Sequence, residues 1–468
     1  MVFSSLVFLC IFLPIVFLGH TILPRIRAKN AMLLLASLVF YAYGEPVYVV
    51  LMIASALCNY LFALWIERFQ DQKKWIVSVA VILNLALLVI FKYAGFLTES
   101  VNTMFGTGFP VPDIRLPIGI SFFTFQAMSY VIDVYRGANK AQKNFGKVLL
   151  YISFFPQLIA GPIVKYHDVE QEIEHRTQSA DGVARGIRRF IAGLSKKVLI
   201  SNVMGMTADA LFGAAVGTLG AATAWVGALS YLFQIYFDFS GYSDMAIGLG
   251  WMFGFHFKEN FNYPYSSTSI REFWRRWHIS LSSWFLEYLY IPLGGNRKGK
   301  VRTCINKFIV FLCTGIWHGA NVTFLFWGIY HGCFLMLEEF VPFFRKEGGK
   351  IKTAVMRIYT LLVVCIGFVF FRADTMTQGV QWVKAMFTGF SMGAASTSLA
   401  LQQLTPLYLA TFTVACIASF PVFEKWKSDG RYQEFYNNMA FVCSIAGLVL
   451  CMLSLAGGTY NPFIYFRF

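Results

Sequence analysis

The sequence predicts an all-α polytopic membrane protein, and three observations support this fold class. Hydrophobic residues make up 57% of the 468 positions. Charged residues make up only 13%, about half of the roughly 25% that soluble domains carry. The apolar residues also form long runs separated by short basic loops, a pattern typical of membrane-spanning helices. We therefore expect a single membrane domain over residues 1–468, because no linker or low-complexity segment marks off a soluble domain.

Simple apolar runs near both ends of the chain are expected to cross the membrane as helices. They lie in an N-terminal part, 1–147, and a C-terminal part, 341–468, at about 2–18, 31–43, 47–66, 75–91, 116–135, 353–371, 407–420 and 441–455. Basic residues cluster after the first, third and fifth runs, whereas the loop before residue 116 contains no lysine. Because cytoplasmic loops carry the excess of Lys and Arg, the N-terminus is predicted to lie outside.

The net charge of +15 is attributed to the basic loops, which set the topology and contact anionic lipid head groups. A nucleic-acid partner is therefore not expected. A basic cytosolic face also suits an anionic cofactor. The nine cysteines are scattered through apolar runs without a CxxC pair, so neither a zinc site nor a disulfide framework is expected.

The middle of the chain, 148–340, departs from simple spans. "LLYISFFPQLIAGPIVKY" is apolar but is interrupted by Pro156, Gly161 and Pro162. Broken spans are tolerated at membrane depth only where they are buried in protein or line a wet cavity, so this segment is predicted to be re-entrant. The following "ARGIRRFIAGLSKKVLI" interleaves basic and apolar residues at helical spacing, which predicts an interfacial helix.

Two acidic residues stand in the apolar segment "YFDFSGYSDMAIGLG". Charged groups at such depth are costly and are functional candidates. Asp244 follows Gly241 and is expected to cap a new helix. Asp238 lies deeper in the apolar run, where it is expected to orient a histidine or to bind a cation or cofactor.

A helix is predicted from Ser269 to about Ile291, because Ser269 and Glu272 have the spacing of a capping box. Arg275 and the neighbouring Arg276 suit phosphate groups, which belong either to a ligand or to lipids. Helical spacing places Arg271, Trp274, Arg275, His278 and Ser282 on one stripe.

Two histidines occur in "CTGIWHGANVTFLFWGIYHG". A neutral histidine can act as a general base near physiological pH. His318 lies between Gly315 and Gly319, which are expected to leave room for a ligand. His331 would lie about 220° round a continuous helix from His318, and it is expected to be structural. A hydrogen-bonded structural role is the alternative for His318 as well.

Five motifs together resemble those of the bacterial membrane-bound O-acyltransferase family, most closely the membrane subunits of alginate O-acetyltransferases. They are "FFPQLIAGPI", "QIYFDFSGYSDMAIGLG", "NFNYPY", "EFWRRWHISLSSWF" and "GIWHGANVTFLFWGIYHG". The resemblance implies a bundle of roughly 11 or more spans with re-entrant and interfacial helices around a central channel. It also implies a catalytic core in 148–340 and a location in the bacterial inner membrane.

The resemblance further implies an acetyltransferase that uses cytosolic acetyl-CoA and has no permanently bound cofactor. His318 corresponds to the catalytic histidine, here a general base, and His278 lines the same channel. An extracytoplasmic partner, often an SGNH-type acetyltransferase, passes the acetyl group to a polysaccharide. As an inference beyond the motifs, Trp274, Arg275, Arg276 and Asp238 are candidates for contact with the donor.

Three alternatives remain open at this stage. The same motifs are compatible with peptidoglycan O-acetylation and with teichoic acid D-alanylation, in which the donor is a carrier-protein thioester. Broken spans and buried acids also occur in transporters. The sequence has no internal inverted repeat of the kind that many transporters contain, which counts against transport.

Overall fold

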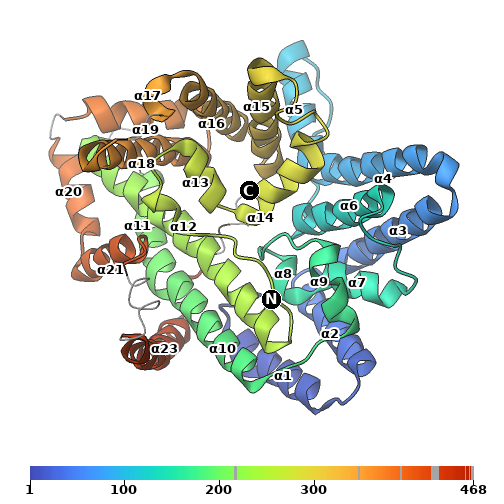
Figure 1. The fold of residues 1–468 in the computed structure, drawn as a ribbon. Coiled ribbons are helices and arrows are strands. Elements are labelled where there is room, and N and C mark those ends of the chain that lie inside the picture. The colour runs from blue at the N-terminus through green and yellow to red at the C-terminus, as the bar shows by residue number, and fades with distance from the viewer. Residues whose placement is uncertain are drawn as a thin grey trace. The chain divides into compact units, whose positions relative to one another are not determined.

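The computed structural model describes residues 1–214, 219–345, 348–390, 393–422, 432–458, 460–462 and 464. Every element of regular structure in these ranges is helical (Figure 1). The predicted all-α class is therefore confirmed for the described part of the chain.

The chain forms two compact units. Unit 1 consists of Met1–Phe190 and Ser243–Glu259, and unit 2 consists of Ile191–Tyr242 and Asn260–Phe468. Two of the three boundaries fall inside helices, α10 (Ala180–Ser195) and α12 (Ala221–Met252), so each of these helices contributes residues to both units.

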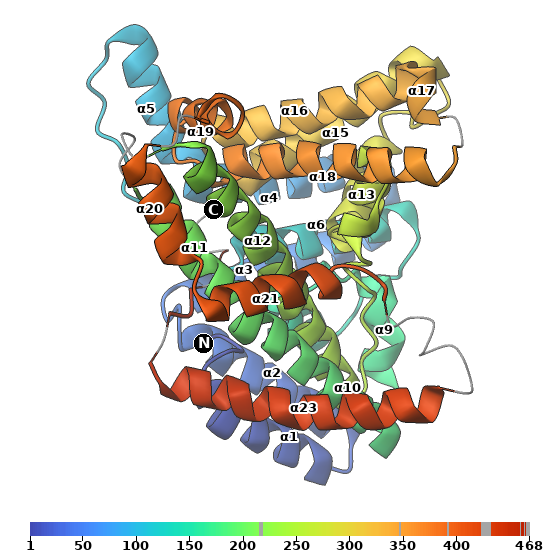
Figure 2. The same cartoon turned by 90° about the vertical axis from the view of Figure 1, so that its left-hand side faces the viewer.

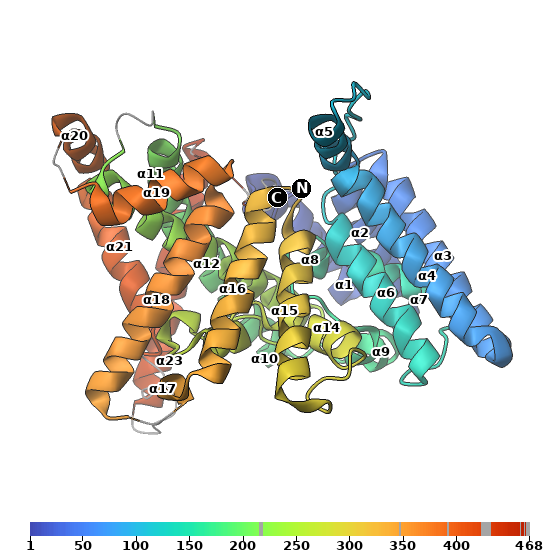
Figure 3. The ribbon, with the colours of Figure 1, turned by 90° about the horizontal axis from the view of Figure 1, so that it is seen from above.

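Unit 1 is built mainly from N-terminal helices. In Figure 3, α3, α4 and α6 lie side by side, and α3 also packs against α7. Buried amides join α3 and α4, because Asn59 and Asn84 exchange hydrogen bonds of 3.2 and 2.8 Å. Such pairing satisfies polar groups inside apolar helices. The helices are α1 (Leu13–Ile22), α2 (Ile26–Ala42), α3 (Tyr48–Arg68), α4 (Lys73–Leu88), α5 (Ala94–Phe105), α6 (Ile120–Arg136), α7 (Phe145–Ser153), α8 (Phe155–Leu158) and α9 (Tyr166–Glu174).

The segment after α7 is broken, as predicted. Helix α7 ends at Ser153, the four-residue α8 follows, and the chain is then irregular up to Lys165. This irregular backbone is buried. The Tyr151 hydroxyl donates to the Val164 carbonyl at 2.9 Å, which supplies a partner that a helix would otherwise provide.

Helix α12 corrects the expectation that Asp244 caps a helix. The helix runs through Gly241 without a break, so Asp244 lies in its interior. Within unit 1, the Asp244 carboxylate accepts from Arg189 at 2.6 Å, and Arg189 also pairs with Glu259 at 2.5 Å. An ion pair, rather than a helix terminus, compensates this charge.

Unit 2 contains the remaining helices, and in it α15, α16 and α18 run side by side (Figures 2 and 3). After η4 (Lys196–Ser201) come α11 (Asn202–Phe212), α13 (Ile270–Arg276), α14 (Ile279–Phe285), η7 (Leu286–Tyr290), α15 (Gly299–His318), α16 (Val322–Phe340), α17 (Pro342–Arg345), α18 (Lys350–Arg372), α19 (Met376–Thr388), α20 (Ala394–Gln403), α21 (Pro406–Ala418) and α23 (Gln433–Ala456).

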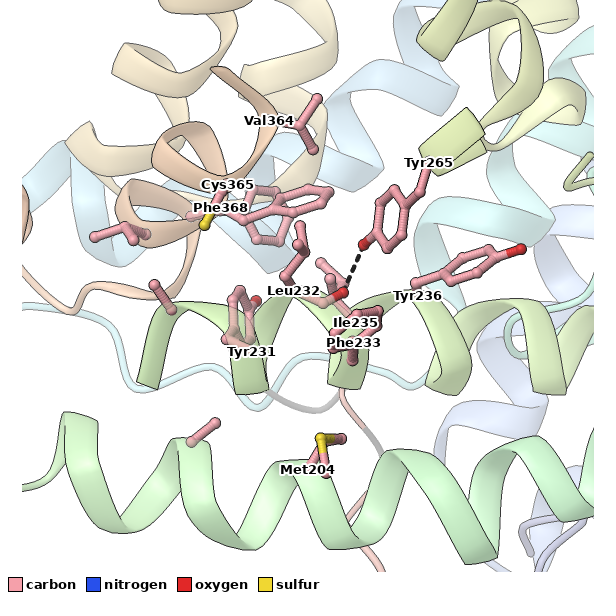
Figure 4. Close-up of a cluster of buried hydrophobic side chains, with 14 of the residues drawn as sticks. Met204, Tyr231, Leu232, Phe233, Ile235, Tyr236, Tyr265, Val364, Cys365 and Phe368 are labelled. Carbon is pink, nitrogen blue, oxygen red and sulfur yellow. Dashed lines mark hydrogen bonds between the residues drawn. The ribbon is translucent and has the colours of Figure 1, made fainter. Parts of the chain in front are cut away.

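The core of unit 2 joins α12 to α18. Figure 4 shows Tyr231 and Leu232 of α12 with Cys365 and Phe368 of α18 in one buried cluster. The Tyr265 hydroxyl reaches into this cluster and donates to the Leu232 carbonyl at 2.5 Å. The cluster therefore ties the loop that precedes α13 to the long helix α12.

In the described residues, four helices are long and apolar enough to cross a membrane, and the bent pair α20–α21 is a possible fifth span. The four are Tyr48–Arg68, Gln70–Phe105, Lys350–Arg372 and Gln433–Ala456. They coincide with the predicted runs 47–66, 75–91, 353–371 and 441–455. A total of roughly 11 spans is not confirmed, because most other helices are shorter or more polar than a simple span.

Candidate active site

His278 lies at a sharp break between α13 and α14, and this break corrects the single helix predicted over 269–291. The capping box at its start is present, since the Ser269 hydroxyl accepts from the Glu272 amide at 3.0 Å. Helix α13 nevertheless ends at Arg276. His278 adopts φ +45°, in the left-handed region that non-glycine residues rarely occupy. Strained residues of this kind cluster at functional sites.

Asn260 explains why the helix breaks at His278. Its carbonyl accepts from the Ile279 amide at 2.9 Å, and its side-chain oxygen accepts from the Ser280 amide at 3.0 Å. The same oxygen accepts from the Ser280 hydroxyl at 2.9 Å. These bonds satisfy the first amides of α14, which a continuous helix would have bonded internally.

The His278 ring is buried and oriented by its neighbours. Nδ1 lies 3.3 Å from Oδ1 of Asn260, and the edge-on Phe239 ring is 4.5 Å away between centroids. Among the described residues, Nε2 has no hydrogen-bond partner. Burial disfavours the charged ring and lowers the pKa of His278 to about 3, so the imidazole is neutral.

His318 is the last residue of α15. Aromatic rings surround it, with centroids of Trp317, Trp327 and Phe371 at 4.9, 5.3 and 5.0 Å. The segment around it is a helical hairpin rather than one helix, because α16 begins at Val322 with Asn321 as its cap. The Asn321 side chain accepts from the Thr323 amide at 3.0 Å.

The two glycines beside His318 serve helix packing rather than ligand access. A Cβ atom on Gly315 would lie 2.5 Å from the Phe324 carbonyl oxygen. A Cβ atom on Gly319 would lie 2.3 Å from the Phe324 ring. Both positions face α16, which corrects the expectation that these glycines make room for a ligand.

His278 and His318 line one cavity in unit 2. Its volume is about 290 Å³, and α13, α14, η7 and α15 form its walls. Most lining side chains are apolar, and the exceptions include Ser282, Thr314, Arg275 and Lys307. An apolar cavity with a few convergent polar groups is the usual form of a small-molecule site.

The four residues that the sequence suggested for contact with the donor differ in whether they line the cavity. Trp274 and the exposed Arg275 line the cavity. Arg276 does not line it, because its guanidinium pairs with Glu272 at 2.9 Å and donates to the Asn262 carbonyl at 3.2 Å. Asp238 is also absent from the lining and pairs with the buried Lys197.

Lys307 is a lining residue that the sequence reasoning missed. It pairs with Glu339 of α16 at 3.0 Å, and Glu339 also pairs with Arg271. Its isolation in the sequence could have singled it out, because Lys307 is the only lysine or arginine between Cys304 and Leu337. An isolated cation in an apolar helix is a functional candidate.

His331 lies outside the cavity lining, as a structural role predicts. It is fully buried, and the rings of Trp274 and Trp327 each lie 5.0 Å from its ring. Among the described residues, neither ring nitrogen has a hydrogen-bond partner. His331 therefore acts here as an aromatic packing residue behind the cavity wall. The part of the chain that the structure describes holds no cluster of three or more His, Cys, Asp or Glu suited to a metal.

Comparison with known proteins gives consistent matches. The model of the membrane-bound O-acyltransferase family matches residues 134–373. A probable alginate O-acetylase of Pseudomonas putida is 40% identical over the full length of both chains. The corresponding Pseudomonas aeruginosa protein is 44% identical over 89% of this chain and 80% of its own length. A peptidoglycan O-acetyltransferase of Helicobacter pylori is 36% identical over 82% of this chain and 80% of its own.

Proposed function

The chain belongs to the membrane-bound O-acyltransferase family and is an O-acetyltransferase, and from this premise we propose its reaction. The protein takes acetyl groups from cytosolic acetyl-CoA and passes them across the bacterial inner membrane for O-acetylation of an extracytoplasmic polysaccharide such as alginate. The observation that carries this proposal is the shared cavity of His278 and His318, with its apolar walls.

The chemistry needs a base and a site that excludes water. His318 accepts the proton of the acceptor hydroxyl while that oxygen attacks the thioester carbonyl carbon. The carbon–sulfur bond breaks and the CoA thiolate leaves. The thiolate takes up the proton that His318 accepted, so His318 returns to its neutral form. The apolar walls support this role because they keep water from hydrolysing the thioester.

His278 is proposed to orient a reacting group rather than to act as the base. Asn260 lies beside Nδ1, which favours the tautomer with the proton on that nitrogen. Nε2 is then a hydrogen-bond acceptor, and a hydroxyl in the cavity is a suitable donor for it. Orientation of the acceptor hydroxyl supplies the alignment that acyl transfer requires.

Arg275 is proposed to hold a phosphate of the donor at the cavity. It is exposed, and among the described residues no acidic side chain forms an ion pair with it, unlike Arg271 and Arg276 of the same helix. Lys307 contributes a second positive charge, which Glu339 partly compensates. Arg276 is a weaker candidate, since Glu272 already neutralises it.

We propose a separate extracytoplasmic partner, of the SGNH-type acetyltransferase class, for the final step on the polysaccharide. The described residues support this division because their regular elements are all helices, four of them long and apolar enough to cross a membrane. The N-terminus is proposed to lie outside, on the basis of the basic loops.

Peptidoglycan is the second candidate acceptor, and the Helicobacter pylori relative favours it. Both candidates share the donor and the base. They differ only in the extracytoplasmic acceptor, so identifying which glycan becomes acetylated decides between them.

The test uses the full chain in proteoliposomes with its co-purified extracytoplasmic partner. Acetyl-CoA is supplied on the cytosolic side, free CoA is measured by mass spectrometry, and acetyl esters are measured on alginate oligosaccharides or peptidoglycan fragments on the other side. We expect CoA release and acetylated alginate with wild type and neither with His318→Ala. Undiminished turnover in a folded His318→Ala protein contradicts the role of His318. Turnover only with a D-alanyl carrier-protein thioester, or glycan movement without acetyl-CoA, contradicts the proposed reaction.

A further inference from the structure

A buried ion pair in unit 2 is not explained by the proposed chemistry. Lys197 of η4 pairs with Asp238 of α12, and their side chains are only 3% and 2% exposed. The Ser201 hydroxyl also donates to Asp238 Oδ1 at 3.3 Å. Burying two charges is costly, so a buried ion pair is weak evidence for stability and calls for another explanation.

This ion pair also binds a segment that is remote in sequence, of which Tyr460–Pro462 and Ile464 are described. The Lys197 ammonium donates to the Pro462 carbonyl, and the Ile464 amide donates to Asp238 Oδ2 at 3.2 Å. Each partner of the pair thus holds the backbone of the segment. We call Lys197, Asp238 and their bonds to Pro462 and Ile464 the clasp.

Two further contacts fasten the same segment. The Tyr460 hydroxyl donates to Asp209, which also accepts from Arg372 at 2.6 Å. Asn202 of α11 donates to the Asn461 side chain at 3.2 Å. The segment is therefore docked by side chains from several helices of unit 2, and the clasp is its most buried attachment.

The turn of α12 that carries Asp238 also packs against residues that line the cavity. Tyr236 and Phe239 are three residues apart and share a helix face, whereas Asp238 points about 100° away from Phe239. The Phe239 ring lies edge-on to His278 at 4.5 Å, and the Tyr236 ring lies 5.9 Å from Trp277. His278 and Trp277 both line the cavity.

We propose that Lys197 and Asp238 are positioning residues for the acetyl transfer. Their clasp fastens Pro462 and Ile464 to η4 and α12 and, through Phe239, fixes the ring of His278 at the cavity. That the clasp fixes the segment and the His278 ring is inferred from contacts alone. That this fixation affects turnover rests on the function proposed above. If one partner is removed, the other charge remains buried and unpaired, so α12 must shift or admit water.

The experiment compares Asp238→Asn, Lys197→Met, the double variant Lys197→Met/Asp238→Asn and Phe239→Leu in the full chain in nanodiscs. Hydrogen exchange followed by mass spectrometry reports the Ile464 amide, which bonds Asp238, and the Ile279 and Ser280 amides, which bond Asn260. Steady-state kinetics with acetyl-CoA give kcat and KM separately. Ser230→Ala is the matched control, because it removes a buried α12 hydrogen bond, 2.9 Å to Tyr408, away from the clasp.

We expect each single charge variant to expose all three amides to exchange and to lower kcat by about 10- to 100-fold, with little change in KM. The double variant, which leaves no unpaired charge, recovers the Ile279 and Ser280 protection and most of kcat. Phe239→Leu keeps Ile464 protected yet lowers kcat, and Ser230→Ala resembles wild type.

Three outcomes overturn the proposal. Protection of Ile464 in both single variants shows that the clasp does not hold the segment. Exposure of Ile464 with an unchanged kcat in both single variants shows that the clasp does not position His278. A double variant as impaired as the single variants shows that charge pairing is not the cause. If wild type transfers no acetyl group, the proposed function fails, and the exchange of Ile279 and Ser280 still decides whether the clasp controls the His278 turn.

Discussion

Oδ1 of Asn260 lies 3.3 Å from Nδ1 of His278, and Asn260 also bonds the two amides that follow this histidine. One asparagine therefore sets both the backbone turn and the ring orientation. The left-handed conformation of His278 at φ +45° persists because Asn260 compensates it.

Asn260→Ala is expected to lower kcat by about 10- to 100-fold, because His278 loses the side chain that orients it and Ser280 loses its side-chain acceptor. Steady-state acetyl transfer measures the effect. Asn262→Ala is the control, since the bonds at this exposed neighbour involve its backbone. Equal losses in the two variants would contradict a specific role for Asn260.

Asn260→Asp is expected to add an acid limb to the pH profile of kcat. In wild type, burial holds the pKa of His278 near 3, so the ring stays neutral as pH falls through the working range. A carboxylate beside Nδ1 raises that pKa, so the ring becomes protonated at higher pH and activity is lost earlier on acidification. The check is kcat from about pH 5 to pH 8, where His titration normally falls. A profile identical to wild type would count against a neutral His278 in turnover.

His318→Ala and His331→Phe are expected to separate the two histidines of the α15–α16 hairpin. Loss of the general base lowers kcat by about 10²- to 10⁴-fold. His331→Phe keeps an aromatic ring between Trp274 and Trp327 and removes no hydrogen bond formed among the described residues, so kcat should stay within about threefold of wild type. Acetyl-transfer rates of well-folded protein provide the measurement. A comparable loss in His331→Phe would assign chemistry to His331.

Arg275→Ala is expected to raise KM for acetyl-CoA about 10-fold with a smaller change in kcat, because it removes a charge-assisted contact to phosphate. Arg276→Ala is the matched control, because its guanidinium is engaged by Glu272. The prediction is checked by KM for acetyl-CoA at low and high salt. It fails if Arg276→Ala raises KM and Arg275→Ala does not.

Gly315→Ala is expected to destabilise the hairpin by about 1–3 kcal/mol, because the added methyl group meets backbone rather than a mobile side chain. The new Cβ atom would lie 2.5 Å from the Phe324 carbonyl oxygen. Gly349→Ala is the control, because nothing lies within 4 Å of its added Cβ. Thermal unfolding in detergent compares the two variants, and equal melting temperatures would refute close packing at Gly315.

Local patterns were sufficient for part of this site. The capping box at Ser269 and Glu272 and the break after α7 follow from neighbouring residues, and both occur in the structure. The helix break at His278 was not predictable in this way, because the 269–291 segment has helical spacing throughout. Asn260, which is 18 residues away, overrides that preference.

By itself, the sequence determined the helical membrane class and the family resemblance, and it singled out His278 and His318, because these depend on composition and on contiguous motifs. Only the tertiary structure decided which charged groups meet. It pairs Asp238 with Lys197, turns Arg276 towards Glu272, and brings Lys307 to the cavity wall. The physical reason is that a buried charge must find its partner, and for Asp238 and Lys307 the partner lies on another helix.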